Sequence, residues 1–197
     1  MTKIHRLFSA VVLASLFGCA GSDFVRSTPE AFKLGATTFN QVVRQMGEPR
    51  RIGEVTKNGA VLKSISYSYA ATGGEPLEQG VIPVRVEAFF FHNDTLVGQE
   101  FLSSFKSDNT NFDDTKIPAI VKGKTTRSEV IQLLGRPSTM YIPPMIKEGP
   151  VEAVGYLYQT TSGGAFVGFK IFRKALTISL DGKGLVVDID YSSSGSK

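Results

Sequence analysis

Few side chains in this sequence are able to do chemistry. It contains one cysteine, Cys19, and two histidines, His5 and His92, among 197 residues. An ordinary zinc site needs several such ligands, and cysteine–histidine catalysis needs one of each in the folded chain. A serine–histidine–aspartate arrangement would have to use His92, which stands beside Asn93 and Asp94 in a predicted solvent-facing turn, and no Gly-x-Ser-x-Gly sequence supports it. We therefore predict no catalytic residue, no metal site, no cofactor and no enzymatic activity.

Cys19 stands at the end of an apolar run near the start of the chain. Basic residues precede the mostly apolar stretch 7–17, which is too short for the roughly 20 residues of a membrane-spanning helix and is typical of a signal peptide. Leu16-Phe17-Gly18-Cys19 looks like a bacterial lipobox, which predicts cleavage before Cys19 and lipidation of its sulfur with diacylglycerol. Stable anchoring then takes two or more acyl chains. Ala20 follows in place of the Asp that resembles an inner-membrane retention signal, so the sequence favours the periplasmic face of the outer membrane.

Two other patterns could bind ions. Asp108, Asp113 and Asp114 lack the ligand spacing and terminal Glu of a calcium loop, so we interpret them as part of a solvated linker. Thr72-Gly73-Gly74 and Ser162-Gly163-Gly164 lack the Lys-Ser/Thr of a phosphate loop and are interpreted as mobile hairpin loops.

Charge and composition exclude little else. The net charge of +4 falls to about +2 once the signal peptide is removed, which gives no reason to expect nucleic-acid binding. The sole cysteine allows no internal disulfide, so stability must come from packing. The runs 81–91 and 163–172 are rich in Phe and Val; we interpret them as core, and any part exposed at a loop tip as a binding patch.

An internal repeat covers most of the chain. The segments 35–49 and 123–137 align without gaps, with six of the 15 positions identical, where unrelated segments would share about one. In both segments a Thr-x-x-Gln/Glu capping box precedes an apolar stripe at helical spacing, and a Gly and a Pro follow it. Each segment therefore predicts a helix of about nine residues, too short to be stable without packing.

Strands are predicted after each helix. Aromatic and β-branched segments at 64–70 and 153–158 precede two hairpins. These hairpins are expected at 84–91 with 95–101, and at 174–180 with 185–191. The predicted fold class is α+β, with two tandem units, each a short helix followed by a three-stranded antiparallel meander.

The predicted organisation divides the chain into six parts. They are a signal peptide at 1–18, a lipidated tether at 19–33, a first unit at 34–102, a linker at 103–118, a second unit at 119–191 and a tail at 192–197.

These motifs carry a resemblance to a known family. The string Gly-x-Thr-Thr-x-x-x-Val-x-x-x-x-Gly-x-Pro, with aromatic strands and a Gly-turn hairpin behind a lipobox, is similar to the SmpA/OmlA (BamE-like) outer-membrane lipoproteins. In duplicate, the helix-plus-meander unit is similar to the β-lactamase inhibitor protein fold. The family's barrel-assembly subunit has one copy of the unit, whereas this chain has two, with longer Gly-rich loops at 71–83 and 159–168. Of the site residues, the resemblance carries over Cys19 alone.

Two functions stay open. The first is a non-enzymatic, outer-membrane-anchored protein that binds an envelope partner, such as the barrel-assembly machinery, and supports outer-membrane assembly or envelope integrity. Its contact surface would be the exposed sheet faces or the Phe-rich Gly-Gly loops. The alternative is an inhibitor or ligand-binding module that receives a hydrolase or a cell-wall fragment between the two units. Copurification with the barrel subunit would support the first, and a saturable complex with a soluble enzyme or glycan the second.

Overall fold

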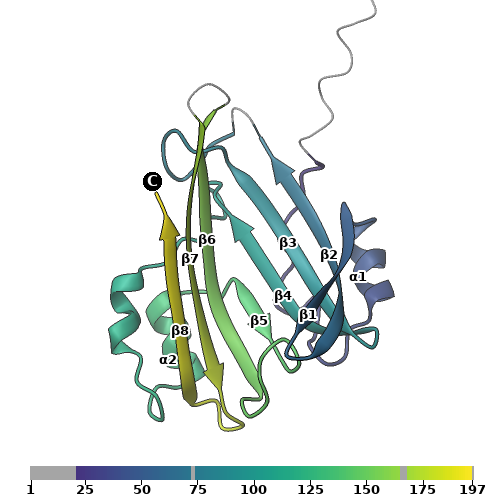
Figure 1. Cartoon of the computed structure of the whole chain (residues 1–197), viewed down its shortest axis with the longest axis vertical. Coiled ribbons are helices and arrows are strands. Elements are labelled where there is room, and N and C mark those ends of the chain that lie inside the picture. The colour runs from purple at the N-terminus through teal and green to yellow at the C-terminus, as the bar shows by residue number, and fades with distance from the viewer. Residues whose placement is uncertain (1–20, 72–73, 165–167, 197) are drawn as a thin grey trace, which may run out of the picture.

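A computed structural model describes residues 21–71, 74–164 and 168–196 of the chain. Within these ranges, two short α-helices and one 3-10 helix, η1, accompany eight strands (Figure 1). In chain order the elements are α1 (Phe39–Met46), β1 (Arg51–Lys57), β2 (Ala60–Ala70), β3 (Val84–His92), β4 (Thr95–Ser103), η1 (Asp114–Ala119), α2 (Arg127–Leu134), β5 (Thr139–Tyr141), β6 (Glu152–Gly164), β7 (Gly168–Leu180) and β8 (Val186–Gly195).

All eight strands form one antiparallel sheet, in which the spatial order equals the chain order. The predicted fold class is therefore wrong: each α-helix is followed by four strands rather than three, and the strands make one continuous sheet rather than separate meanders. β1 was missed because its sequence is largely charged or polar, and β5 because it spans only three residues between two prolines. β4 and β5 pair through Gly98–Glu100 and Thr139–Tyr141, and this short junction joins the two halves of the sheet.

Both predicted helices are present and begin as the sequence indicates. Thr38 and Thr126 are the N-caps, and each forms a capping box. The Thr side chain accepts a hydrogen bond from the backbone N–H of Gln41 or Glu129, and the side chain of that residue accepts one from the backbone N–H of the Thr. Gly47 and Gly135 follow the helices at φ of 81° and 85°, a backbone conformation that favours glycine.

The repeat extends to the contacts that fix each helix on the sheet. Tyr67 Oη on β2 donates to the Gly47 carbonyl at 2.7 Å, and Tyr156 Oη on β6 donates to the Gly135 carbonyl at 2.9 Å. The backbone carbonyl just before each N-cap accepts from a hairpin N–H: Thr37 accepts from Leu96 in the first half, and Thr125 accepts from Val186 in the second. A β-bulge also falls at the same place in the β3–β4 and β7–β8 hairpins. The duplicated sequence therefore produces a duplicated local structure.

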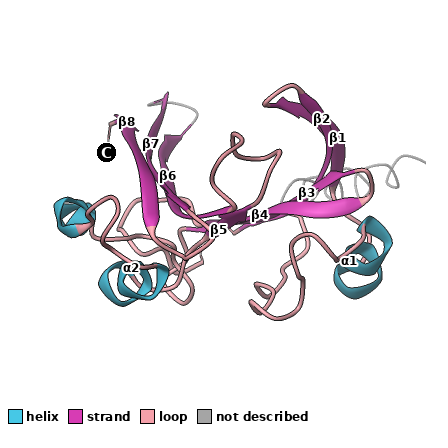
Figure 2. Cartoon of the chain, turned by 90° about the horizontal axis from the view of Figure 1, so that it is seen from below, coloured by secondary structure: helices cyan, strands magenta, loops and turns pink. Residues whose placement is uncertain are grey.

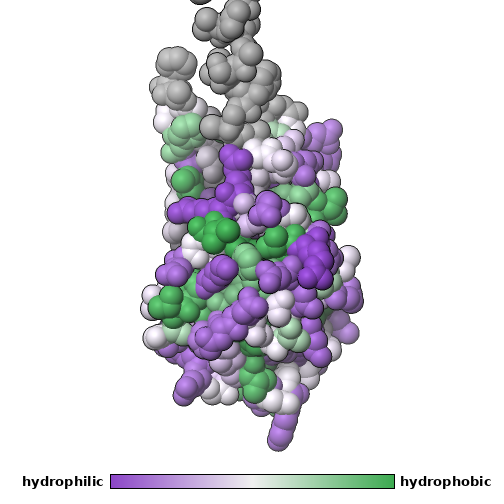
Figure 3. Space-filling view, turned by 90° about the vertical axis from the view of Figure 1, so that its right-hand side faces the viewer, coloured by the Kyte–Doolittle hydropathy of each residue, from purple (hydrophilic) through white to green (hydrophobic). Residues whose placement is uncertain are grey.

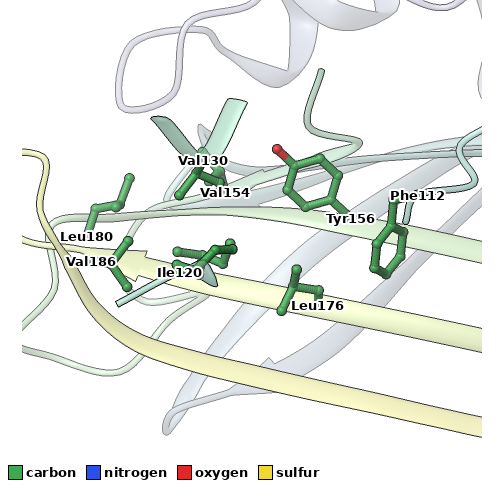
Figure 4. Packing of buried hydrophobic residues seen from close by; sticks show 9 residues of the cluster. Phe112, Ile120, Val130, Val154, Tyr156, Leu176, Leu180 and Val186 are labelled. Carbon is green, nitrogen blue, oxygen red and sulfur yellow. The ribbon is translucent and has the colours of Figure 1, made fainter. Parts of the chain in front are cut away.

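Two apolar clusters lie between the helices and the sheet. The first includes Phe32, Val42, Ile65, Phe89 and Phe91, and the second is shown in Figure 4. In the second, Val130 of α2 packs on side chains of β6, β7 and β8, and Phe112 of the connecting segment closes one side. Both α-helices cover the same face of the sheet, which curves away from them (Figure 2). Below, this is the helix face, and the concave side is the open face.

Candidate binding surface

The open face of the sheet is lined by short, mostly hydroxyl-bearing side chains. Because side chains alternate along a strand, the residues next to the buried Ile65 and Tyr67 of β2 point the other way. These are Ser64, Ser66 and Ser68, all half-buried. Thr177 and Ser179 occupy the same face on β7. Such a surface offers hydrogen-bonding groups close to the backbone and leaves room for a partner above it.

A loop covers the first half of this face and leaves the second half open. The segment between β5 and β6 lies over β2 and β4, where Met145 packs against Leu62 and Val97. Asn58 Nδ2, in the β1–β2 turn, donates to the Pro144 carbonyl at 2.9 Å and fixes the loop there. The hydroxyl surface is thus bounded on one side by this loop.

The junction between the halves forms the floor of the open face. Tyr141 of β5 donates through Oη to Glu100 Oε1 of β4 at 2.7 Å. Burial, followed by the nearby Glu100 carboxylate, raises the pKa of the Tyr141 phenol well above its ordinary value. With this raised pKa, Tyr141 stays protonated, as a hydrogen-bond donor, at any physiological pH. Thr139, the first residue of β5, faces Gly155 of β6 and is also buried.

Charges differ between the two margins of the open face. By its register with β2, Arg51 of the edge strand β1 lies on this face and is exposed. Asp188 and Asp190 of the opposite edge strand, β8, face the same side, and Asp188 accepts from Lys122 Nζ at 2.6 Å. The lysine lowers the pKa of the Asp188 carboxyl. The margins consequently carry opposite charge.

Charged residues also mark both free sheet edges. β1 contains Arg51, Glu54 and Lys57, and β8 contains Asp188 and Asp190. Charges on edge strands oppose pairing with another strand, so strand addition is disfavoured relative to contact through the open face.

On the side that carries α1 and β1, apolar residues are interspersed with polar ones (Figure 3).

The segment that follows the predicted lipidation site lies along the helix face between α1 and α2. Ser27 donates to Glu87 through its backbone N–H at 3.2 Å and through Oγ at 2.5 Å. Gln99 Nε2 donates to the same carboxylate at 2.8 Å, and Glu87 is fully buried. A buried carboxylate needs such donors to offset lost hydration. Residue 27 is therefore held firmly against the sheet.

Two arginines complete this contact. Arg85 pairs with Asp108 at 2.7 Å and with Asp23. Arg26 donates to the Pro137 carbonyl at 2.6 Å and lies over the Phe101 ring. Burial, and then the neighbouring Arg136, lower the pKa of Arg26 to about 10.

Of the residues singled out in the sequence, the described ones do not form one site. Cys19 and His5 fall outside the described residues. His92 ends β3, beside Asn93 and Asp94 at positive φ, in the predicted hairpin turn. Ser162-Gly163-Gly164, predicted to be a loop, instead belongs to β6, while Thr72-Gly73-Gly74 lies largely outside the described residues.

The three aspartates of the connecting segment have separate structural roles. Asp108 accepts from Arg85 and Ser103, Asp113 caps η1, and Asp114 accepts from Lys174 and Tyr191. Across residues 21–71, 74–164 and 168–196, no group of three or more His, Cys, Asp or Glu side chains could hold a metal ion. None of the helices in this described part has the length and apolar character needed to cross a membrane.

Sequence reasoning named exposed sheet faces as a possible contact surface but did not identify the residues that form the open face. The alternation of Ser with Ile and Tyr at 64–69 was the available signal, because it indicates a strand with one apolar and one polar side.

No protein-family model and no curated protein matches the sequence. Among solved structures, the fold is distantly similar to a crystal structure of a Streptococcus mutans protein proposed to be a β-lactamase inhibitor protein. The two share 13% identical residues with a TM-score of 0.40, over 79% of this chain and 82% of that chain.

Proposed function

We propose that this chain is a non-enzymatic lipoprotein, anchored in the outer membrane through Cys19, that binds another envelope protein through the open face of its sheet. The observation that carries the binding role is the uncovered part of this face. Both α-helices lie on the other side of the sheet, and the β5–β6 loop packs over the first half only, so the hydroxyl-lined second half stays uncovered.

Several features support a protein as the partner. A sheet face with short side chains can receive protruding side chains from a partner surface, and a protein can meet both of its margins at once. Arg51 at one margin and Asp190 at the other would orient such a partner by charge. The charged sheet edges leave the open face as the better contact surface.

The leader sequence supports the membrane setting. Leu16-Phe17-Gly18-Cys19 supplies the lipidation motif, and only Ala20 separates Cys19 from the first described residue, Gly21. The repeated Gly-x-Thr-Thr motif resembles that of the SmpA/OmlA lipoproteins, which supports a role in outer-membrane assembly or integrity. The division of the chain into signal peptide, tether, units, linker and tail is part of the same proposal.

A second candidate uses the same face for a different partner. An inhibitor or ligand-binding module would receive a soluble hydrolase or a cell-wall fragment there. The curvature of the sheet favours this candidate, because a concave face fits a protruding partner (Figure 2).

A pull-down from detergent-solubilised cells separates these candidates. The chain, tagged after Lys197, is compared with three variants: Cys19→Ala, Thr177→Arg on the uncovered half of the open face, and Gln132→Arg on the exposed side of α2. We expect barrel-assembly subunits with wild type and Gln132→Arg, a loss of tenfold or more with Thr177→Arg, and no recovery with Cys19→Ala. Thermal unfolding verifies that each variant is folded.

Two results would contradict the proposal. Equal recovery with Thr177→Arg and wild type would exclude the open face as the contact. If wild type captures no envelope complex and Cys19→Ala still reaches the outer membrane, both the anchor and the assembly role are wrong. A saturable complex with a purified hydrolase or cell-wall fragment would then establish the second candidate.

A further inference from the structure

The outer part of the β6–β7 hairpin projects beyond the rest of the sheet. β8 pairs with β7 only from Phe172 onward, and Ser196, just after β8, donates through its N–H to the Ile171 carbonyl at 3.2 Å. Residues 168–170 therefore pair with β6 alone among the described strands. On the other side of β6, a single bridge joins Ser162 to Val81, and Ile82 N–H donates to the Thr161 carbonyl at 2.8 Å. A two-stranded ribbon of this kind has little surrounding structure to bury its side chains.

This projecting part nevertheless carries large apolar side chains. Phe169 is 61% exposed and Ile171 is 53% exposed, and the two alternate positions point to the same side of β7. Arg173, also exposed, points to that same side, and the exposed Lys170 lies between Phe169 and Ile171 but points to the other side of the strand. Apolar side chains flanked by cations on a protruding element suit the surface of an anionic bilayer, where rings and alkyl groups enter the interface and cations meet phosphate groups.

The described part of the chain begins at this same end, with Gly21. Gly21 lies against the backbone of Ser68 and Tyr69, at the end of β2. β2 and β6 run in the same direction in the sheet, so the end of β2 and the hairpin lie at one end of the molecule (Figure 1). Cys19 is two residues before Gly21 in the sequence, and two residues of chain reach at most about 7 Å.

We propose that the outer β6–β7 hairpin contacts the phospholipid surface through Phe169 and Ile171, with Lys170 and Arg173 against the head groups. The proposal rests on the lipid anchor proposed above, which would hold this end of the molecule at the membrane. About four strand spacings, or roughly 19 Å, separate β2 from β6 across the sheet. The hairpin would thus be a second point of contact that fixes how the body stands on the membrane.

The chain contains no tryptophan, so a single introduced one reports its own surroundings. Phe169→Trp places it on the hairpin. Val61→Trp is the matched control, because Val61 is 60% exposed and lies nine residues before Ala70, about 30 Å from that end of β2. Each lipidated protein is reconstituted into vesicles of phosphatidylethanolamine and phosphatidylglycerol with brominated acyl chains, which quench nearby tryptophan.

We expect the Phe169→Trp protein to be quenched several-fold more strongly than the Val61→Trp protein. Equal quenching, or none in either, would overturn the proposal. In the Cys19→Ala background, adding Phe169→Ser and Ile171→Ser should weaken vesicle binding about tenfold or more, because each removes an apolar group from the interface. An unchanged affinity would also overturn it.

Failure of the anchor is recognised separately. Mass spectrometry of the purified chain reports whether Cys19 is acylated, and an unmodified mass refutes the anchor itself. The hairpin is then judged on the unacylated chain with the same vesicles added from outside. Quenching of the Phe169→Trp protein would support the lipid contact, and its absence would refute it.

Discussion

Gly155 lies on β6, next to the short strand β5 that joins the two halves of the sheet, and its replacement by Ala is expected to destabilise the whole fold. It faces Thr139 across the β5–β6 pairing. A methyl group on Gly155 would come within 2.6 Å of the Leu176 carbonyl oxygen, and closer still to Thr139 Oγ1. Real side chains do not approach so closely, so some neighbour must move.

Neither neighbour is free to do so. Thr139 is 4% exposed, and the Leu176 carbonyl belongs to the central part of β7. Overpacking a rigid site typically costs about 1–3 kcal/mol, and we expect Gly155→Ala to fall near 3 kcal/mol. Thr139→Ala removes one of the two clashes, so the double variant should recover about 1 kcal/mol relative to the sum of the single changes.

Urea denaturation followed by circular dichroism measures these free energies of unfolding. Gly164→Ala is the control in the same strand, because a methyl group there meets nothing within 4 Å. It should change the free energy of unfolding by less than about 0.5 kcal/mol. A loss below about 0.5 kcal/mol for Gly155→Ala, or strict additivity with Thr139→Ala, would refute the reasoning.

Four further predictions test other parts of the fold. Tyr67→Phe and Tyr156→Phe remove equivalent hydrogen bonds, so each should lower the free energy of unfolding by about 1 kcal/mol in urea titrations, and a much larger loss at one site would contradict the equivalence. Burial raises the pKa of Tyr67 to about 12 from an ordinary 10.0, so its stabilising contribution is complete below pH 10 and is lost as the pH rises to about 12; Tyr67→Phe should reduce the fall in Tm over that window. Glu87→Leu leaves the donors of Ser27 and a glutamine unpaired and should cost about 2–3 kcal/mol in thermal unfolding; an unchanged Tm would show that the network contributes nothing. Hydrogen bonds from a tyrosine and a lysine lower the pKa of Asp114 to about 2 from 3.8, so its contribution is present above pH 4 and is lost as the pH falls toward 2; Asp114→Asn should make Tm less dependent on pH there, and an identical pH profile would argue against it.

The parts of the fold that local sequence determines were predicted well. Both helices begin at the predicted capping boxes, and the β3–β4 and β7–β8 hairpins lie where their turn residues indicate. The repeat was visible because Thr, Gly and Pro have the same conformational roles in both copies. The number of strands was not, since β1 and β5 are held by pairing with β2, β4 and β6 rather than by their own composition.

The helix face of β3 shows why contacts distant in sequence were missed. Along residues 84–90, the alternation places Val, Val, Ala and Phe on one side and Arg85, Glu87 and Phe89 on the other. A reading of polarity would bury the first set and expose the two charged residues. The structure buries Arg85 and Glu87, because a segment about 60 residues earlier lies over them and supplies their partners. The alternation of polar and apolar residues within a strand does not reveal that a distant segment of the chain covers one of its faces.

The two halves are related by a step along the sheet. β1 and β5 run in the same direction, and so do β4 and β8. The free edge of β8 could therefore pair with the β1 strand of another chain in the way that β4 pairs with β5. Repetition of this sort has no two-fold axis and does not close on itself. Chains that associated edge to edge would therefore grow as an open row rather than stop at a dimer. The length of each row would be limited only by the charges on β1 and β8.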